Sequence, residues 1–254
     1  MASPLTVWSS AADGALSSSN GVYSTARAGS GVGYSLTAAS EWVGQWGAYN
    51  IQEVSLDFLT SGVGAGNTVT TATLSLYPAD FTSRSRSLDL QARLDDWGPT
   101  IGSTDWVAGD AFNAATLLAH FTLSGANWNS GHYNVFADDA FPSNVAKTGT
   151  TYVVLCDANF AAGTAPPDDY SQRVYLANDA TGVGGTDRDP KLYVEYGAPP
   201  VAPTVTIMAI SDITGNSAAS GGWITDPGSA EVTDRGVCWN TTGTPTIADS
   251  HTHD

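Results

Sequence analysis

The sequence predicts an all-β protein, and three observations lead to that fold class. Glycine and proline, the residues that most often form turns, number 27 and 12 among 254 residues. Glutamate and lysine, which usually fill exposed helix faces, are scarce: the acids are nearly all aspartate, and lysine occurs only at Lys147 and Lys191. Short runs with alternating apolar residues recur between turn signals, which is the spacing typical of a β-sandwich.

Residues 1–20 contain one strand-like piece, Leu5-Thr6-Val7-Trp8, followed by small and polar residues. In an extended strand, Leu5 and Val7 lie on one face and Trp8 on the other. This segment is therefore either the first strand of the next domain or a free arm that can act as a donor strand.

Residues 21–197 form the first predicted domain. Strand patterns occur in seven ranges: 48–59, 68–77, 87–94, 132–137, 151–157, 173–178 and 190–197. Residues 110–121 depart from this pattern. Asp110 is a plausible N-cap, and the apolar residues behind it recur at helical spacing: Phe112, Ala115, Leu118 and Phe121. We expect a short helix there, inserted in the sandwich.

A proline-rich linker follows at residues 198–204, where the run APPVAPT favours extended, semi-rigid backbone. Residues 205–254 then form the second predicted domain, with strand patterns in 203–210, 216–224 and 233–240. An immunoglobulin-like sandwich needs about seven strands. Three or four strands therefore predict an incomplete Ig-like or fibronectin-like β-sandwich.

Residues 203–250 read PTVTIMAISDITGNSAASGGWITDPGSAEVTDRGVCWNTTGTPTIADS. This stretch resembles the fibronectin-like repeat of bacterial surface and secreted proteins, above all in its PTV start, its RGVCW core and its PTI-x-DS turn. In that repeat, further strands close the sandwich. The resemblance therefore implies an Ig-like fold from which the closing strands are missing.

Residues 54–77, the region around Trp97 and Trp106, and the run DPKLYVEYG at 189–197 resemble jelly-roll modules of bacterial surface and virion proteins. Such modules are structural, adhesive or carbohydrate-binding. A jelly roll followed by an Ig-like domain is also similar to the architecture of protomers of environmental extracellular filaments. The resemblance implies an extracellular, cell-surface or virion location.

An incomplete sandwich leaves apolar side chains uncovered, and a strand from another chain can cover them. The exposed face is expected to carry Trp223, Val237 and Trp239, with Leu5, Val7 and Trp8 supplied by the neighbour. The function predicted on this basis is a non-enzymatic structural protomer of an extracellular filament or virion fibre, a homopolymer built head-to-tail. Two simpler alternatives remain open: the full protein carries further strands, or residues 199–254 pack on the jelly roll.

A carbohydrate-binding or adhesive module is the alternative function. Trp97, Trp106 and Trp128 are candidates for a sugar-stacking platform, and the competing interpretation places these large side chains in the core or at its rim. Asn240 begins the only N-x-S/T sequon and is a candidate glycosylation site.

Composition excludes several partners. A net charge of −16 opposes binding to nucleic acid and to anionic lipid, and the chain has no apolar run long enough to insert into a membrane. No catalytic motif is present, so an enzyme is not expected. The two cysteines are expected to be buried free thiols.

No cofactor is predicted, and calcium is the metal that acidic loops would hold. Three aspartate pairs are candidates, although none has the spacing of a known calcium loop and solvated turns explain them more simply: Asp138-Asp139, Asp168-Asp169 and Asp187-x-Asp189. His251 and His253 would project to one side of a strand, where they could bind Zn²⁺ or simply belong to a mobile tail.

Overall fold

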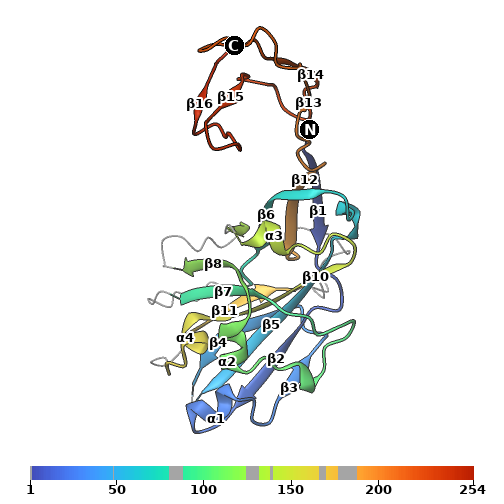
Figure 1. Ribbon diagram of the computed structural model, residues 1–254. Coiled ribbons are helices and arrows are strands. Elements are labelled where there is room, and N and C mark those ends of the chain that lie inside the picture. The colour runs from blue at the N-terminus through green and yellow to red at the C-terminus, as the bar shows by residue number, and fades with distance from the viewer. Residues whose placement is uncertain are drawn as a thin grey trace. The chain divides into compact units, whose positions relative to one another are not determined.

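A computed structural model describes residues 2–47, 49–79, 88–123, 132–137, 140–165, 170–176 and 188–254. The chain divides into two compact units, Met1–Ala198 and Pro199–Asp254, and each is described by itself. Antiparallel strands make up most of the regular secondary structure of the described residues, so the predicted all-β fold class is confirmed (Figure 1).

The smaller sheet of the first unit has four strands in the order β1-β12-β6-β9, and every neighbouring pair is antiparallel. Its members are β1 (Ser3–Trp8), β12 (Lys191–Gly197), β6 (Thr68–Leu76) and β9 (Asn134–Phe136). The N-terminal segment is thus a strand at the edge of its own unit, which is the first of the two interpretations left open by the sequence.

The larger sheet has eight strands, and six of them follow the order β11-β4-β5-β10-β7-β8. Two further strands extend it, because β2 pairs with both β5 and β3. Its members are β2 (Gly14–Ser19), β3 (Gly33–Ser35), β4 (Ser40–Trp46), β5 (Asn50–Leu59), β7 (Leu88–Leu94), β8 (Leu117–Leu123), β10 (Thr150–Asp157) and β11 (Tyr170–Tyr175).

The chain crosses repeatedly between the two sheets. In sequence order, β5 lies in the larger sheet, β6 in the smaller, β7 and β8 in the larger, β9 in the smaller, β10 in the larger and β12 in the smaller. Such crossing between two antiparallel sheets is typical of a β-sandwich.

The main core lies between the two sheets. Leu56 and Phe58 of β5 and Val153 of β10 meet Leu74 and Leu192 of the smaller sheet, and all five side chains are fully buried. Strand β10 is buried on both faces, as expected for the centre of a covered sheet.

Short helices cover the other face of the larger sheet. Phe112 of α2 and Phe160 of α4 pack with Val154 and Cys156 of β10 in a second buried cluster. The helices of the unit are α1 (Tyr23–Arg27), α2 (Gly109–Ala114), α3 (Phe141–Asn144) and α4 (Ala158–Ala162), with 3₁₀ turns at Ser61–Val63 and Ser103–Asp105.

The helix predicted over residues 110–121 is wrong in its second half. Helix α2 ends at Ala114, and the chain continues as β8 from Leu117 to Leu123. Pairing with β7 places Ala119 opposite Ala92 and Phe121 opposite Leu90. This long-range pairing overrides the local helical spacing of the apolar residues.

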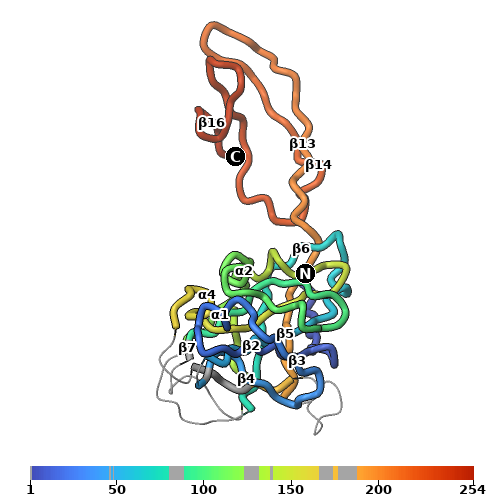
Figure 2. The backbone as a smooth tube through the Cα atoms, turned by 90° about the horizontal axis from the view of Figure 1, so that it is seen from below, coloured from blue at the N-terminus to red at the C-terminus, as the bar shows by residue number. Residues whose placement is uncertain are grey.

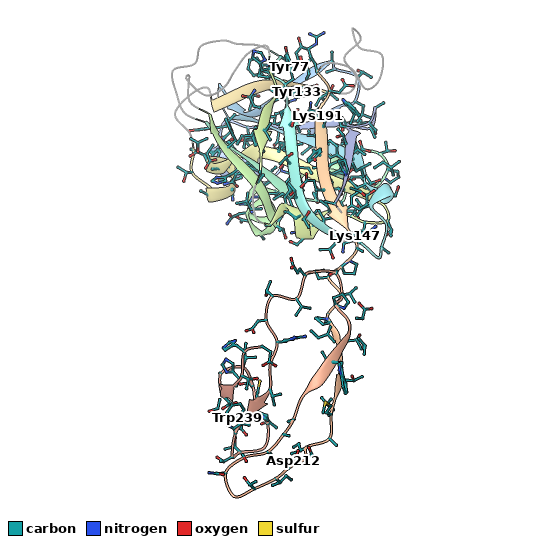
Figure 3. The ribbon with its side chains drawn as sticks, turned by 90° about the horizontal axis from the view of Figure 1, so that it is seen from above. Tyr77, Tyr133, Lys147, Lys191, Asp212 and Trp239 are labelled. Atoms are coloured by element: carbon teal, nitrogen blue, oxygen red, sulfur yellow. The ribbon has the colours of Figure 1, made fainter. Side chains whose placement is uncertain are left out.

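Aromatic rings pack along the strands of the smaller sheet. The rings of Tyr77 and Tyr133 meet edge to face with centroids 5.4 Å apart, and the ammonium group of Lys191 lies 3.8 Å from the centroid of Tyr133 (Figure 3). The cation over the ring face holds the start of β12 against this part of the unit.

The second unit consists of two short antiparallel ladders. Strand β13 (Thr204–Ile207) pairs with β14 (Gly222–Asp226), and β15 (Cys238–Trp239) pairs with β16 (Ser250–His251). Figure 2 shows the chain leaving along β13 and returning along β14, before it continues toward the second ladder. The structure describes all of residues 199–254, and none of them is buried.

Candidate assembly groove in the second unit

A groove of about 600 Å³ lies between the β13–β14 ladder and the segment that leads into β15. Apolar side chains line it from both sides, together with Thr206, Ser220, Arg235 and Asp254; the apolar ones are Val205, Ile207, Met208, Trp223, Ile224, Val237 and Cys238. We call this feature the assembly groove.

Two glycines allow the backbones around the groove to approach closely. A Cβ on Gly222 would collide with the carbonyl oxygen of Thr206, and one on Gly236 would collide with that of Thr252. Beside Gly236, the amide of Thr252 donates to the carbonyl of Val237 at 3.0 Å, and the amide of Asp254 donates to that of Arg235 at 2.9 Å. These bonds extend the β15–β16 pairing along the groove wall.

The apolar side chains of the groove are open to solvent. Ile207 is 87% exposed, Trp223 is 62% exposed and Val205 is 61% exposed. Full burial of one such side chain contributes about 1.5–3 kcal/mol. Three of them therefore represent roughly 5–9 kcal/mol, which is of the order of the stability of a whole domain.

The structure brings together only part of the predicted acceptor face. Trp223 and Val237 line the assembly groove, whereas Trp239 lies outside it, opposite Ser250 in the second ladder and 52% exposed (Figure 3). Sequence reasoning missed Met208 and Cys238 as lining residues. Alternation along a strand predicts which residues share a face. It does not predict which segment lies opposite that face across the groove, here the one that leads into β15.

The predicted donor residues lie in β1. Leu5 pairs with Val194 and Val7 with Leu192, and both side chains are partly buried against the core. Trp8 is on the other face of the strand, opposite Lys191, and is 41% exposed. As the edge strand of the four-stranded sheet, β1 is hydrogen-bonded to β12 alone within that sheet.

The proposed sugar platform is not formed by Trp97. This side chain is 8% exposed and packs with Leu16 and Ile101, so its indole face is not available for stacking. Trp106 is half-buried, lies edge to face with Phe160 and directs its indole nitrogen toward the carbonyl of Arg27 at 3.4 Å. Trp128 lies outside the described residues.

Asn240 is held in a turn. Its side-chain oxygen accepts from the amides of Thr242 and Gly243 at 3.1 and 2.9 Å, and its Nδ2 donates to Asp249 at 3.2 Å. Attachment of a glycan to Nδ2 would replace a hydrogen of this group while the turn holds the side chain half-buried.

The candidate calcium pairs lie largely outside the described residues. Only Asp189 is described among them, and it is buried. Among the described residues, no group of three or more histidine, cysteine or acidic side chains is arranged to hold a metal ion.

Buried acids in the first unit are a feature that the sequence did not indicate. Burial raises the pKa of Asp13 and of Glu53 well above its usual range, and that of Asp157 to about 6. Each has a structural partner: Asp13 accepts from the amide of Asp57, Glu53 from that of Val107, and Asp157 from two amides of α4. We interpret these acids as supports of the fold.

Comparison with protein-family models and with curated proteins finds no match to this chain. Among the described residues, no helix has the length and apolar character needed to cross a membrane.

Proposed function

We propose that this protein is a non-enzymatic structural protomer of an extracellular filament or virion fibre. One observation carries the proposal: a groove with exposed apolar side chains runs through a unit in which no residue is buried. A β-sandwich without a core is stabilised when an added strand covers its apolar faces and pairs with its open edges. In this proposal, the strand that enters the groove belongs to a second copy of the chain.

The donor in this proposal is β1. Exchange of β1 replaces one set of antiparallel backbone hydrogen bonds by another, so its net cost is set by side-chain burial. Only Leu5 and Val7 of this strand pack on the home core, and both are partly buried. Their removal from the first unit is offset by burial of the groove residues, of which Ile207 alone is 87% exposed.

Donor and acceptor lie in different units of the chain. A contact between unlike surfaces is heterologous, and repetition of such a contact produces a ring or an open fibre. The net charge of −16 keeps the copies apart unless a specific contact joins them. Head-to-tail assembly through one strand is consistent with both features.

The test is negative-stain electron microscopy of the full chain beside two matched variants. Ile207→Asp places a charge inside the assembly groove, whereas Ile247→Asp places one at a side chain that is 83% exposed and does not line the groove. We expect fibres from the parent chain and from I247D, and monomers from I207D, because the carboxylate removes an apolar contact and must lose its water when a strand covers the groove.

Two results would count against the proposal. Fibres from I207D that match those of the parent chain would show that the groove takes no part in assembly. If the parent chain stays monomeric at all concentrations, the protein does not form a polymer and the proposal is wrong.

A further inference from the structure

Two histidines in the second unit face each other through their Nε2 atoms. His251 is the last residue of β16 and His253 lies two residues further on, so both rings project to the same side of the chain. The two Nε2 atoms are 3.0 Å apart, and the ring centroids are 4.6 Å apart.

The other nitrogen of each ring is already engaged. The Nδ1 of His251 lies 2.7 Å from the backbone carbonyl of Asp249, and the Nδ1 of His253 lies 2.7 Å from the carboxylate of Asp234. A carbonyl and an ionised carboxylate can only accept, so each Nδ1 must carry the hydrogen. In the neutral rings, both Nε2 atoms are therefore unprotonated and carry lone pairs 3.0 Å apart.

Two lone pairs at hydrogen-bond distance repel unless a positive centre lies between them. We propose that His251 and His253 form a binding site for a divalent transition-metal ion, with both Nε2 atoms as ligands. The hydrogen bonds from Nδ1 to the Asp249 carbonyl and the Asp234 carboxylate fix the tautomer and orient each ring, as is common for metal-bound imidazoles. Asp234 is the positioning residue for His253.

The separation of the two ligands indicates the geometry of the ion. With metal–nitrogen bonds of about 2.0–2.1 Å, nitrogens 3.0 Å apart subtend an angle of roughly 95° at the metal. This angle is near the ~90° of tetragonal Cu²⁺ or Ni²⁺ and below the ~109° of tetrahedral Zn²⁺. The site therefore fits Cu²⁺ or Ni²⁺ best.

Solvent reaches this site, which leaves room for the remaining ligands. The side chain of His253 is 66% exposed and that of Asp234 is 56% exposed. Because the described residues contain no third metal-binding side chain in the group, water completes the coordination. The site thus differs from a closed structural zinc site, in which four protein ligands surround the ion.

The experiment is a titration of the untagged full chain with Cu²⁺, read by isothermal calorimetry and by electron paramagnetic resonance. We expect one ion per chain, with nitrogen hyperfine splitting from two imidazoles. H251Q and H253Q should each weaken binding at least about tenfold and remove the two-nitrogen pattern. D234N should weaken it about 10- to 100-fold while keeping that pattern, because both ligands remain.

The matched control is H120Q in the first unit. His120 also faces a carboxylate, with its Nδ1 3.7 Å from Asp89, but its partner is not a second imidazole. This variant should bind Cu²⁺ as the parent chain does. An unchanged affinity in H251Q, H253Q or D234N, or an equal loss in H120Q, would overturn the site.

Discussion

At the scale of single residues, two side chains hold opposite ends of helix α4. The carboxylate of Asp157 accepts from the amides of Asn159 and Phe160 at 2.8 and 3.0 Å, which satisfies the N-terminus. At the other end, Arg27 donates from Nε and Nη2 to the carbonyls of Phe160 and Ala161 at 2.7 and 2.9 Å. A five-residue helix depends on such caps, because it makes few bonds of its own.

Replacement of Arg27 by Ala should destabilise the first unit by about 2–4 kcal/mol. The change removes two charge-assisted hydrogen bonds and leaves both carbonyls without these donors. The Arg27 side chain is only 14% exposed, so little water reaches the carbonyls to replace it. Urea unfolding followed by tryptophan fluorescence measures the loss. Arg235→Ala, in the second unit, is the control and should leave this transition unchanged.

Asp157 should make the first unit more stable at pH 5 than at pH 7. Burial raises the pKa of its carboxyl from 3.8 to about 6, so between these values the folded state holds a proton that the unfolded state has lost. Stability therefore rises as the pH falls through about 6, by up to roughly 3 kcal/mol. Burial raises the pKa of Asp13 and Glu53 as well, which acts in the same direction.

The measurement is the urea midpoint of the first unit as a function of pH. The isosteric change D157N removes one titrating group and should make the profile between pH 4 and pH 7 less steep, while Asp13 and Glu53 still act in the same direction. A parent chain that is less stable at pH 5 than at pH 7 would contradict this account of the buried acids.

At the scale of elements, the β13–β14 ladder depends on a glycine. Gly222 stands where any Cβ would collide with the carbonyl of Thr206, a neighbour across the ladder. A glycine in a strand often marks such a close approach of two backbones. The wall of the assembly groove is thus set by backbone contact as well as by apolar side chains.

Gly222→Ala should separate β13 from β14 and abolish fibre formation. The matched control is Gly215→Ala, at a turn where an added Cβ meets no atom within 4 Å. Electron microscopy checks assembly, and the urea midpoint of the first unit should be the same in both variants because the substitutions lie in the second unit. Fibres from G222A would show that the ladder is not needed.

Many strands could be predicted from the sequence, whereas the strands β2, β3 and β4 and the short helices α1, α3 and α4 were not. Alternating apolar residues identify strands such as β5 and β6, because burial of one face imposes a period of two. The segment 110–121 satisfies a helical period and yet divides into a helix and a strand, because pairing with β7 decides its second half. Local spacing carries no information about that pairing.

The candidate site was predictable only in part. Trp223 and Val237 could be assigned to an uncovered face from strand alternation, and both line the assembly groove. Alternation also predicts Trp239 on this face, but it lies outside the groove. Trp97, a candidate for sugar stacking, is buried in the core. Solvent exposure of an aromatic side chain depends on contacts between distant segments, which one sequence does not reveal.

At the scale of the whole molecule, the two units differ in how their apolar residues are used. In the first unit, more than thirty apolar side chains are buried, whereas in the second unit none is. The first unit is therefore stable through its own core, whereas in the proposed fibre the second unit gains stability from a neighbouring copy. We expect the second unit to become protected from proteolysis only when copies assemble.

Disulfide trapping tests most directly whether β1 of one copy enters the groove of the next. Cys238 lines the groove and carries a free thiol, whereas the thiol of Cys156 is fully buried and burial raises its pKa, so it does not react. With Leu5→Cys or Val7→Cys, we expect oxidation to give a ladder of linked oligomers on a non-reducing gel. Thr6→Cys, on the other face of β1, should give less, since a strand alternates its side chains.

The linked oligomers on the gel should disappear when Cys238→Ser is added to Leu5→Cys, because the groove then has no thiol. This result would place β1 of one copy beside Cys238 of another. Oligomers that persist without Cys238, or L5C and V7C chains that stay monomeric on the gel while forming fibres, would contradict strand exchange through the assembly groove.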